Sequence, residues 1–307
     1  MKLAKLLAGV ALGVLCCPAL AYNVFPYGTN QALKWGNNTI GTSGGVVTWS
    51  LMPDNNGLDA SSPTGISGTS QMGSLMNMLD SAYGAGKAMG ALQNAFGYWS
   101  SVANISFVQV TETGSVPFAA SYASVGTNVI GDIRIGAYNI NGFSGAVGYA
   151  PKPNGGTTLE GDIIFNRDVA YQMAAGREGN NYYLYPNPSP TDPAKNGWYH
   201  NDFEGLFAHE LGHALGLAHT NVTSALMCGY ISTSFNGSTC AYFDQSPPIG
   251  LVPINRIPDA DDIAGIQYLY SAPVPEPETW AMLLAGLGLV GFTARRRRLN
   301  HASSLPS

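Results

Sequence analysis

Three histidines and one glutamate in a single short segment constrain the fold of this chain more than any other feature. The segment runs His209-Glu210-Leu-Gly-His213-Ala-Leu-Gly216-Leu-Ala-His219. At about 100° per residue, His209 and His213 lie one turn apart on the same face of a helix, so both imidazoles can reach one metal ion. Glu210 points away from this pair toward an open coordination position, where a carboxylate can take a proton from water.

The third histidine requires the helix to end before it. A continuous helix would rise about 15 Å from His209 to His219 and would rotate the His219 ring off the face that His209 and His213 share. Gly216 has no Cβ and adopts positive φ without strain, so it can end the helix and turn the chain back toward the ion. The spacing therefore predicts one zinc ion held by His209, His213 and His219, with Glu210 as general acid/base.

An amphipathic helix with three histidines that bind no metal is the alternative. The chain has only 5 histidines, however, and 3 of them fall at these offsets around one glutamate. This coincidence favours the metal site.

The charge distribution excludes one class of partner. The 307-residue chain has 14 basic and 19 acidic residues, and six of the basic ones lie in the two end segments described next. Without those six, and without Glu276 and Glu278, 8 basic residues face 17 acidic ones, a net charge of −9. A body of that charge repels a phosphate backbone, so nucleic acid is not expected as a partner.

Residues 1–21 have the parts of a secretory signal in the order that export requires. Lys2 and Lys5 provide the positively charged start, residues 6–17 the apolar run, and Ala19-Leu-Ala21 the small-residue cleavage pattern. A buried N-terminal helix is the alternative, but it would not need this order. We expect residues 1–21 to be removed on export.

The C-terminal end has a second processing pattern. Val274-Pro-Glu-Pro-Glu278 precedes an apolar stretch at 280–294, which four arginines at 295–298 follow. This arrangement resembles the PEP-CTERM sorting signal of Gram-negative bacteria, which implies cleavage by an exosortase-type enzyme and release into the cell envelope or extracellular matrix. Residues 280–294 are expected to contact the inner membrane transiently. The alternative is a plain C-terminal membrane anchor, for which this stretch is short.

Between these ends, strands precede helices, which predicts an α+β fold. Apolar and β-branched runs predict strands at 45–51, 105–111, 128–136, 143–150 and 160–166. The periodicity of large apolar residues predicts a helix from Met89 to about residue 101, and a long surface excursion is expected from 167 to about 197.

Two further helices have capping signals. Asp202 is the expected N-cap of the helix that carries His209. Asp259, with Asp262 three residues later, is the expected capping box of a last helix that runs through Tyr270.

The metal-binding segment and a methionine eight residues after His219, Met227, resemble the metzincins. Within that group, residues 45–271 look most like the matrixins, through segments 131–135, 161–165 and 261–270. The resemblance implies a zincin-like catalytic domain with a twisted, mostly parallel five-stranded sheet, an active-site helix and a C-terminal helix. It also implies a Met-turn at Met227 below the metal and an edge strand at 144–149 that pairs with extended protein substrates.

The chain departs from the matrixin pattern at its other metal ligands. Gly148 and Ile164 stand where a second, structural zinc would need imidazoles, so only one zinc is expected. Oxygen ligands for a calcium ion are available on four side chains: Asp132, Asp162, Asn166 and Asp168. The alternative is that these are turn and strand-edge side chains without an ion.

The segment after Met227 also departs from the family. It reads Cys228-Gly229-Tyr230 where matrixins have proline, so side-chain preference cannot be carried over and Tyr230 is given no catalytic role. In an oxidising compartment we expect Cys228 to pair with Cys240.

These inferences divide the chain into a signal peptide (1–21), an N-terminal segment (22–44), a catalytic domain (45–271), a sorting segment (272–298) and a tail (299–307). The expected function is zinc-dependent hydrolysis of peptide bonds in protein substrates outside the cytoplasm. The alternative is a non-catalytic surface or matrix protein that retains the fold, but such a protein has no need of Glu210 as a base.

Overall fold

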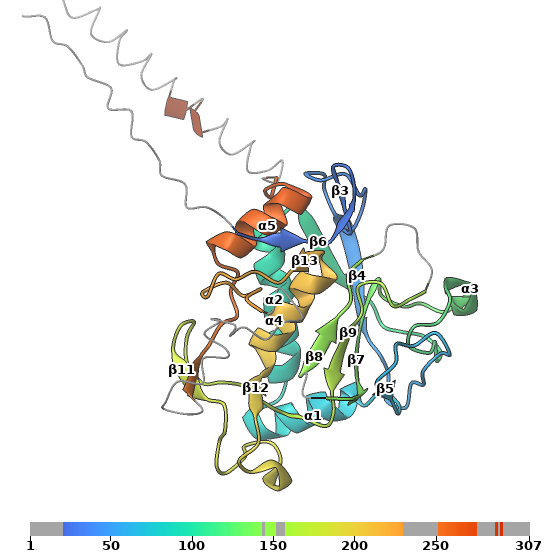
Figure 1. Ribbon diagram of the computed structural model, residues 1–307, viewed down its shortest axis with the longest axis vertical. Coiled ribbons are helices and arrows are strands. Elements are labelled where there is room, and N and C mark those ends of the chain that lie inside the picture. Colours follow the sequence, from blue (N-terminus) through green and yellow to red (C-terminus); the bar gives the residue numbers. More distant parts are fainter. Residues whose placement is uncertain are drawn as a thin grey trace, which may run out of the picture.

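The computed structural model describes residues 21–142, 145–151, 157–229 and 251–274, together with 286–287 and 289–290 (Figure 1). Its main sheet has the strand order β6-β4-β7-β9-β8. These strands are β4 (Gly45–Leu51), β6 (Ile105–Gln109), β7 (Ile133–Ile140), β8 (Ala146–Gly148) and β9 (Ile163–Asn166).

Four of these strands run parallel, and β8 is antiparallel to β9 at one edge. A short strand, β5 (Ile66–Ser67), also pairs with the end of β7. The predicted mostly parallel sheet is confirmed, and β8 occupies the predicted edge position. Phe143 and Ser144, which the edge prediction included, lie outside the described residues.

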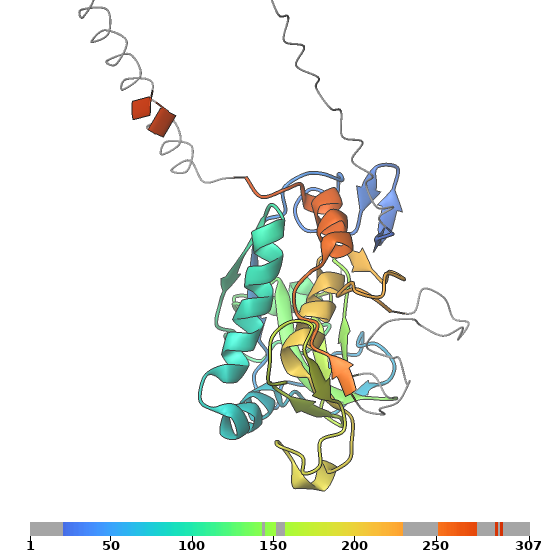
Figure 2. The same ribbon diagram turned by 90° about the vertical axis from the view of Figure 1, so that its left-hand side faces the viewer.

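Three helices pack on one face of the sheet: α1 (Met72–Tyr83), α2 (Lys87–Val102) and α4 (Phe203–Ala214). Figure 2 shows α2 and α4 alongside each other, with α5 (Ala260–Tyr270) across their ends. Stacked aromatic rings join the sheet to the helices. The ring centroids of Trp49 in β4 and Phe96 in α2 are 4.6 Å apart, and those of Phe165 in β9 and Phe203 in α4 are 4.8 Å apart. This shared core fixes α4 relative to the sheet.

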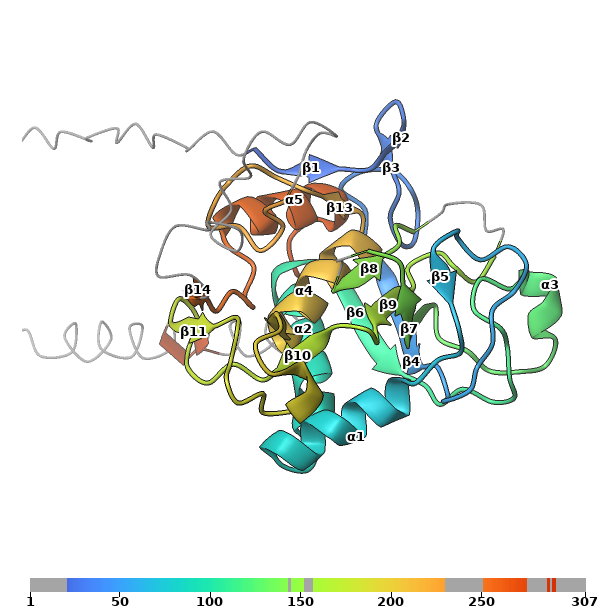
Figure 3. The same ribbon diagram turned by 60° about the horizontal axis from the view of Figure 1, so that its bottom comes forward.

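Loops cover the other face of the sheet (Figure 3). Because side chains alternate along a strand, Ile133 and Ile135 of β7 enter the helical core while Arg134 and Tyr138 point to the loops around β5 and α3 (Tyr122–Val125). Arg134 is fully buried there and forms a two-pronged ion pair with Glu112, with both nitrogen–oxygen distances at 2.8 Å.

The excursion between β9 and α4 has more structure than the sequence predicts. It contains β10 (Ala170–Gln172), β11 (Asn181–Tyr183) and a 3-10 helix (Pro193–Lys195). β10 pairs with β12 (His200–Asp202), and β11 pairs with β14 (Leu251–Pro253), so both partners lie far along the chain. Tyr171 and Tyr182 are buried, which corrects the prediction of a simple surface loop.

The N-terminal residues pack onto the same body as the metal-binding segment. β1 (Asn23–Val24) pairs with β13 (Leu217–Ala218), and β2 (Pro26–Gly28) forms a hairpin with β3 (Gln31–Ala32). Figure 1 shows β1 beside α5, so elements from both ends of the domain meet here.

Within the described part of the chain, no helix has the length and apolar character that crossing a membrane requires. Nearly all of 280–294, and all of 1–20, lie outside the described residues. The predicted membrane contact of 280–294 therefore has no support from the structure.

A buried hydroxyl connects the last helix to the end of α4, and this contact is testable. Tyr270 is fully buried; its Oη accepts from Trp35 N at 2.9 Å and donates to Leu215 O at 2.8 Å. Tyr270→Phe leaves a buried donor and a buried acceptor without this partner, so we expect a loss of about 1–3 kcal/mol in the free energy of unfolding in urea. Tyr268→Phe, on the same helix but 42% exposed, is the control and should change it by less than about 0.5 kcal/mol. Equal losses in the two variants would contradict this role.

Candidate metal centre

Helix α4 carries two of the three histidines, and its ends lie where the sequence predicts. Asp202 is the N-cap, and its carboxylate accepts from Gly205 N at 3.1 Å. At the other end Gly216 has φ of +103°, a conformation that side chains with a Cβ rarely adopt. The chain turns there into β13, which brings His219 back beside α4.

The three histidines converge on one point. His219 Nε2 lies 3.2 Å from His209 Nε2 and 3.0 Å from His213 Nε2. Two zinc–nitrogen bonds of normal length at a tetrahedral angle would separate their nitrogens by about 3.4 Å, close to these values. Within the described ranges, these are the only three His, Cys, Asp or Glu side chains that could jointly hold a metal ion.

Backbone carbonyls orient two of the rings for metal binding. His209 Nδ1 donates to Leu226 O at 2.6 Å, and His213 Nδ1 donates to Leu217 O at 2.8 Å. A carbonyl oxygen can only accept, so the proton of each ring is on Nδ1 and the lone pair of Nε2 faces the centre. Two of the three rings thus direct Nε2 lone pairs toward the centre, so the donor set fits zinc.

Burial keeps these rings neutral, as metal binding requires. It lowers the pKa of His209, and it lowers that of His213 well below its usual range, with further lowering from the neighbouring rings of His209 and His219.

Glu210 lies next to this cluster and contacts the edge strand. Its Oε2 accepts from the backbone N–H of Gly148 in β8 at 2.6 Å. Burial raises the pKa of Glu210 to about 7, partly offset by this hydrogen bond and by His219. A side chain at Gly148 would collide with the backbone carbonyl of Glu210, so β8 approaches α4 closely at this glycine.

The chain at 225–229, here called the Met227 turn, lies against the histidines. The sulfur of Met227 packs on Gly212 of α4, and a Cβ at Gly229 would collide with the His219 ring. Asp262 of α5 holds the turn, because its carboxylate accepts from Leu226 N at 2.7 Å and from Met227 N at 3.0 Å. The sequence identifies Asp262 only as a capping residue, so its second role is a finding of the structure.

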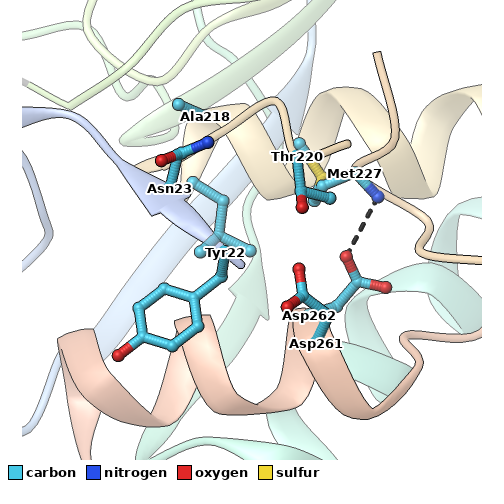
Figure 4. Close-up of a pocket in the computed structure, with 8 residues that line it drawn as sticks. Tyr22, Asn23, Ala218, Thr220, Met227, Asp261 and Asp262 are labelled. Atoms are coloured by element: carbon cyan, nitrogen blue, oxygen red, sulfur yellow. Dashed lines mark hydrogen bonds between the residues drawn. The ribbon is translucent and has the colours of Figure 1, made fainter. Parts of the chain in front are cut away.

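A small pocket lies behind the Met227 turn, between β1, β13 and α5 (Figure 4). Asn23 Nδ2 donates to His219 O at 2.8 Å, so the N-terminal strand directly braces the third histidine. Ala21 N donates to Asp261 Oδ1 at 2.6 Å, next to the Asp262 contact that Figure 4 marks. Nothing in the sequence pattern indicates these contacts.

The structure corrects one residue of the structural-zinc comparison. Val147, not Gly148, pairs with Ile164 across the two strands, and both pack in the apolar cluster of the loop face. Gly148 faces α4 instead. Two aliphatic side chains therefore stand together there, and the expectation of a single zinc ion stays a prediction.

The four candidate calcium ligands are not brought together as a group of acidic ligands. Asp132 accepts from Thr48, Asp168 accepts from Asn139, and Asp162 is buried and accepts from Arg134 N. The Asn166 amide pairs with the backbone of Ile140. The structure thus gives calcium no support.

Two cysteines, Tyr230 and one further histidine remain to be placed. Cys228 is disulfide-bonded, but Cys240 lies outside the described residues, so their pairing stays a prediction. Tyr230 also lies outside them. His200 is fully buried in β12, where its Nε2 lies 3.1 Å from Lys195 O.

Sequence comparison identifies two families in the chain. Residues 75–243 match the matrixin family, and residues 273–298 match the PEP-CTERM protein-sorting motif. Both predicted resemblances are confirmed, and the second assigns the C-terminal segment to a sorting signal.

Three animal proteins are similar to the chain over part of its length. The chain is 29% identical over 194 residues to a macrophage metalloelastase of Oryctolagus cuniculus, covering 61% of this chain and 31% of that protein. It is 30% identical over 189 residues to matrix metalloproteinase-19 of Mus musculus, covering 61% and 25%. It is also 28% identical over 181 residues to a hatching enzyme of Paracentrotus lividus, covering 59% and 22%. The chain thus spans no more than about a third of the length of these relatives. With the family match extending over more than half of its residues, the chain belongs to the matrixins, a family of zinc metalloendopeptidases.

Proposed function

We propose that the chain is an exported zinc-dependent endopeptidase that cleaves extended segments of protein substrates. The observation that carries this proposal is the convergence of three imidazole nitrogens beside the buried carboxylate of Glu210. His209, His213 and His219 would hold the zinc and leave a fourth position open. Held by the three histidines, zinc would supply the Lewis acidity that lowers the pKa of a water molecule and polarises the scissile carbonyl.

Glu210 performs the proton transfers. It takes a proton from the attacking water as the water oxygen bonds to the carbonyl carbon, and it gives that proton to the amine nitrogen as the carbon–nitrogen bond breaks. Burial favours the protonated form of Glu210 and the hydrogen bond from Gly148 favours the charged form, so the carboxyl group is suited both to take and to give the proton. The Gly148 N–H keeps the carboxylate from rotating away from the water.

The edge strand supports an extended substrate. β8 is the last strand of the sheet and, among the described strands, pairs only with β9. Apart from the Gly148 N–H, which donates to Glu210, its outer backbone groups can pair with an extended peptide, which would add to the sheet as one more strand. Because β8 also contacts Glu210, a peptide bound there lies beside the proposed base.

The two terminal segments support work outside the cytoplasm. The sorting motif at 273–298 implies export and processing by an exosortase-type enzyme. With the signal pattern at 1–21, this supports a location in the cell envelope or extracellular matrix of a Gram-negative bacterium.

The catalytic proposal is tested by Glu210→Gln. The amide can still accept from Gly148 N but cannot take a proton, so hydrolysis of casein should fall by about 10²–10⁴-fold while bound zinc is retained. Chelation by EDTA should abolish hydrolysis by the unmodified protein. Full activity of Glu210→Gln would refute the proposal, and a protein that binds zinc but never cleaves casein would favour the non-catalytic alternative.

Metal content has its own matched control. Elemental analysis should find one zinc per chain, lost in His213→Gln and retained in His200→Gln, because His200 lies outside the cluster. Two zinc ions per chain would mean that a second site exists.

The sorting proposal is tested by the mass of the exported protein. In a Gram-negative host with an exosortase-type enzyme, the mature chain should end between about Ser271 and Trp280. Replacement of Pro275-Glu276-Pro277 by alanines should leave the chain uncut. Arg295 to Ser307 on the mature extracellular protein would contradict this processing.

A further inference from the structure

A buried ion pair lies at the beginning of the active-site helix, away from the histidine cluster. Asp202 is fully buried, and its two carboxylate oxygens accept four hydrogen bonds. Two come from backbone N–H groups, those of Gly205 in the first turn of α4 and Ala174 in the excursion. The other two come from Arg256, so the N-cap of α4 is also an ion-pair partner.

Arg256 joins three parts of the chain at this point. Its Nε lies 2.7 Å from Asp202 Oδ2 and its Nη2 lies 2.7 Å from Asp202 Oδ1, a two-pronged geometry that fixes direction as well as distance. Nη2 also donates to Ala174 O at 2.8 Å, and the backbone N–H of Arg256 donates to Glu178 Oε2 at 2.9 Å. The side chain is only 15% exposed, so water weakens these contacts little.

The first turn of α4 is fixed from a second side. Glu204 Oε1 accepts from Asn94 and Tyr98 of α2, and its Oε2 lies 3.8 Å from Arg256 Nε. Arg256 therefore balances two buried carboxylates on one helical turn. Without it, both carboxylates would be left without a positive partner in the protein interior, and the first turn would shift or open to water.

The metal centre depends on the first turn of α4 because its ligands come from two parts of the chain. His209 and His213 belong to α4, whereas His219 is held by Asn23 of β1 and packs on the Met227 turn, which contacts α4 as well through Leu226 O and the Met227 sulfur. His209 follows Asp202 by seven residues, or about two turns of helix. A small axial shift or rotation of α4 moves His209 and Glu210 together relative to His219.

We propose that Arg256 is a positioning residue that sets the start of α4, and thereby the placement of His209 and Glu210 against His219. The proposal rests on the zinc-peptidase function proposed above, but it concerns a residue that touches neither metal nor substrate. It also gives the excursion between β9 and α4 a role, because Ala174 and Glu178 hold Arg256 in place.

Arg256→Met tests the proposal, and the chain offers a matched control. Arg134 forms the same two-pronged pair with a buried carboxylate, Glu112, on the opposite face of the sheet from α4. Arg134→Met should lower stability to urea as Arg256→Met does. Only Arg256→Met should weaken zinc binding in competition with a chelator, by about tenfold or more, the usual effect of losing a group that orients ligands. It should also lower kcat for a peptide substrate with KM changed less than about twofold.

Two lysine variants keep the test decisive if a methionine variant does not fold. Lysine retains the charge but cannot form both prongs, so Arg256→Lys should show an intermediate zinc affinity, while Arg134→Lys should match the unmodified protein. Hydrogen exchange of Gly205 and Leu206 in the metal-free protein should be faster in Arg256→Lys alone.

Unchanged zinc affinity and unchanged exchange in the Arg256 variants would overturn the proposal and leave Arg256 as a stabilising residue only. Equal loss of zinc affinity in the Arg134 variants would overturn it as well. Because zinc affinity is measured without turnover, failure of the peptidase function would be seen separately, in Glu210→Gln.

Discussion

Three imidazole nitrogens that must meet at one point are the constraint on which the rest of the structure depends. Two come from a helix and the third follows the short strand beyond Gly216, so the three nitrogens meet only if helix and strand keep a fixed relative position. The helix is held by aromatic packing against the sheet and α2, and the strand by β1. Most buried polar contacts described above serve one of these two attachments.

Two buried carboxylates hold segments of the backbone in place by accepting hydrogen bonds from them. Asp202 and Asp262 each accept from backbone N–H groups, at the start of α4 and at the Met227 turn. Burial of such carboxylates is costly, and it is offset only when several donors converge on them. Asp202 thus holds the helix that carries His209 and His213, and Asp262 holds the turn that packs on His219.

The metal centre was largely predictable because its chemistry lies in one continuous segment. A helix repeat and a glycine with positive φ sufficed to place His209, His213 and His219 together, and capping residues located both ends of α4. The sheet was predictable for a similar local reason, since β4 and β9 are short, strongly β-forming runs. The range predicted for β7 was too early in the chain, because it began at Asn128 whereas the strand begins at Ile133.

Features that depend on distant partners were not predictable. The strands of the excursion exist only through pairing with β12 and β14. Helix α1 was missed for a different reason, because its buried residues Met72, Leu75, Met76 and Leu79 do follow the helical period and could have been found. Likewise the pairing of Ile164 with Val147, and not with Gly148, depends on the register of β8 against β9, which a one-residue slip would change. Asn23 and Asp262 reach the centre from opposite ends of the domain, which no local pattern can reveal.

That last arrangement has a consequence for timing. A polypeptide is synthesised from its N-terminus, so β1 must wait for β13, almost two hundred residues later, before it can pair. The Met227 turn must wait longer, for Asp262 of α5. Domains with such long-range contacts form them late in folding. The three histidines therefore reach their final arrangement only once α5 has been made and has docked on the Met227 turn, so the proposed centre is among the last parts of the domain to form.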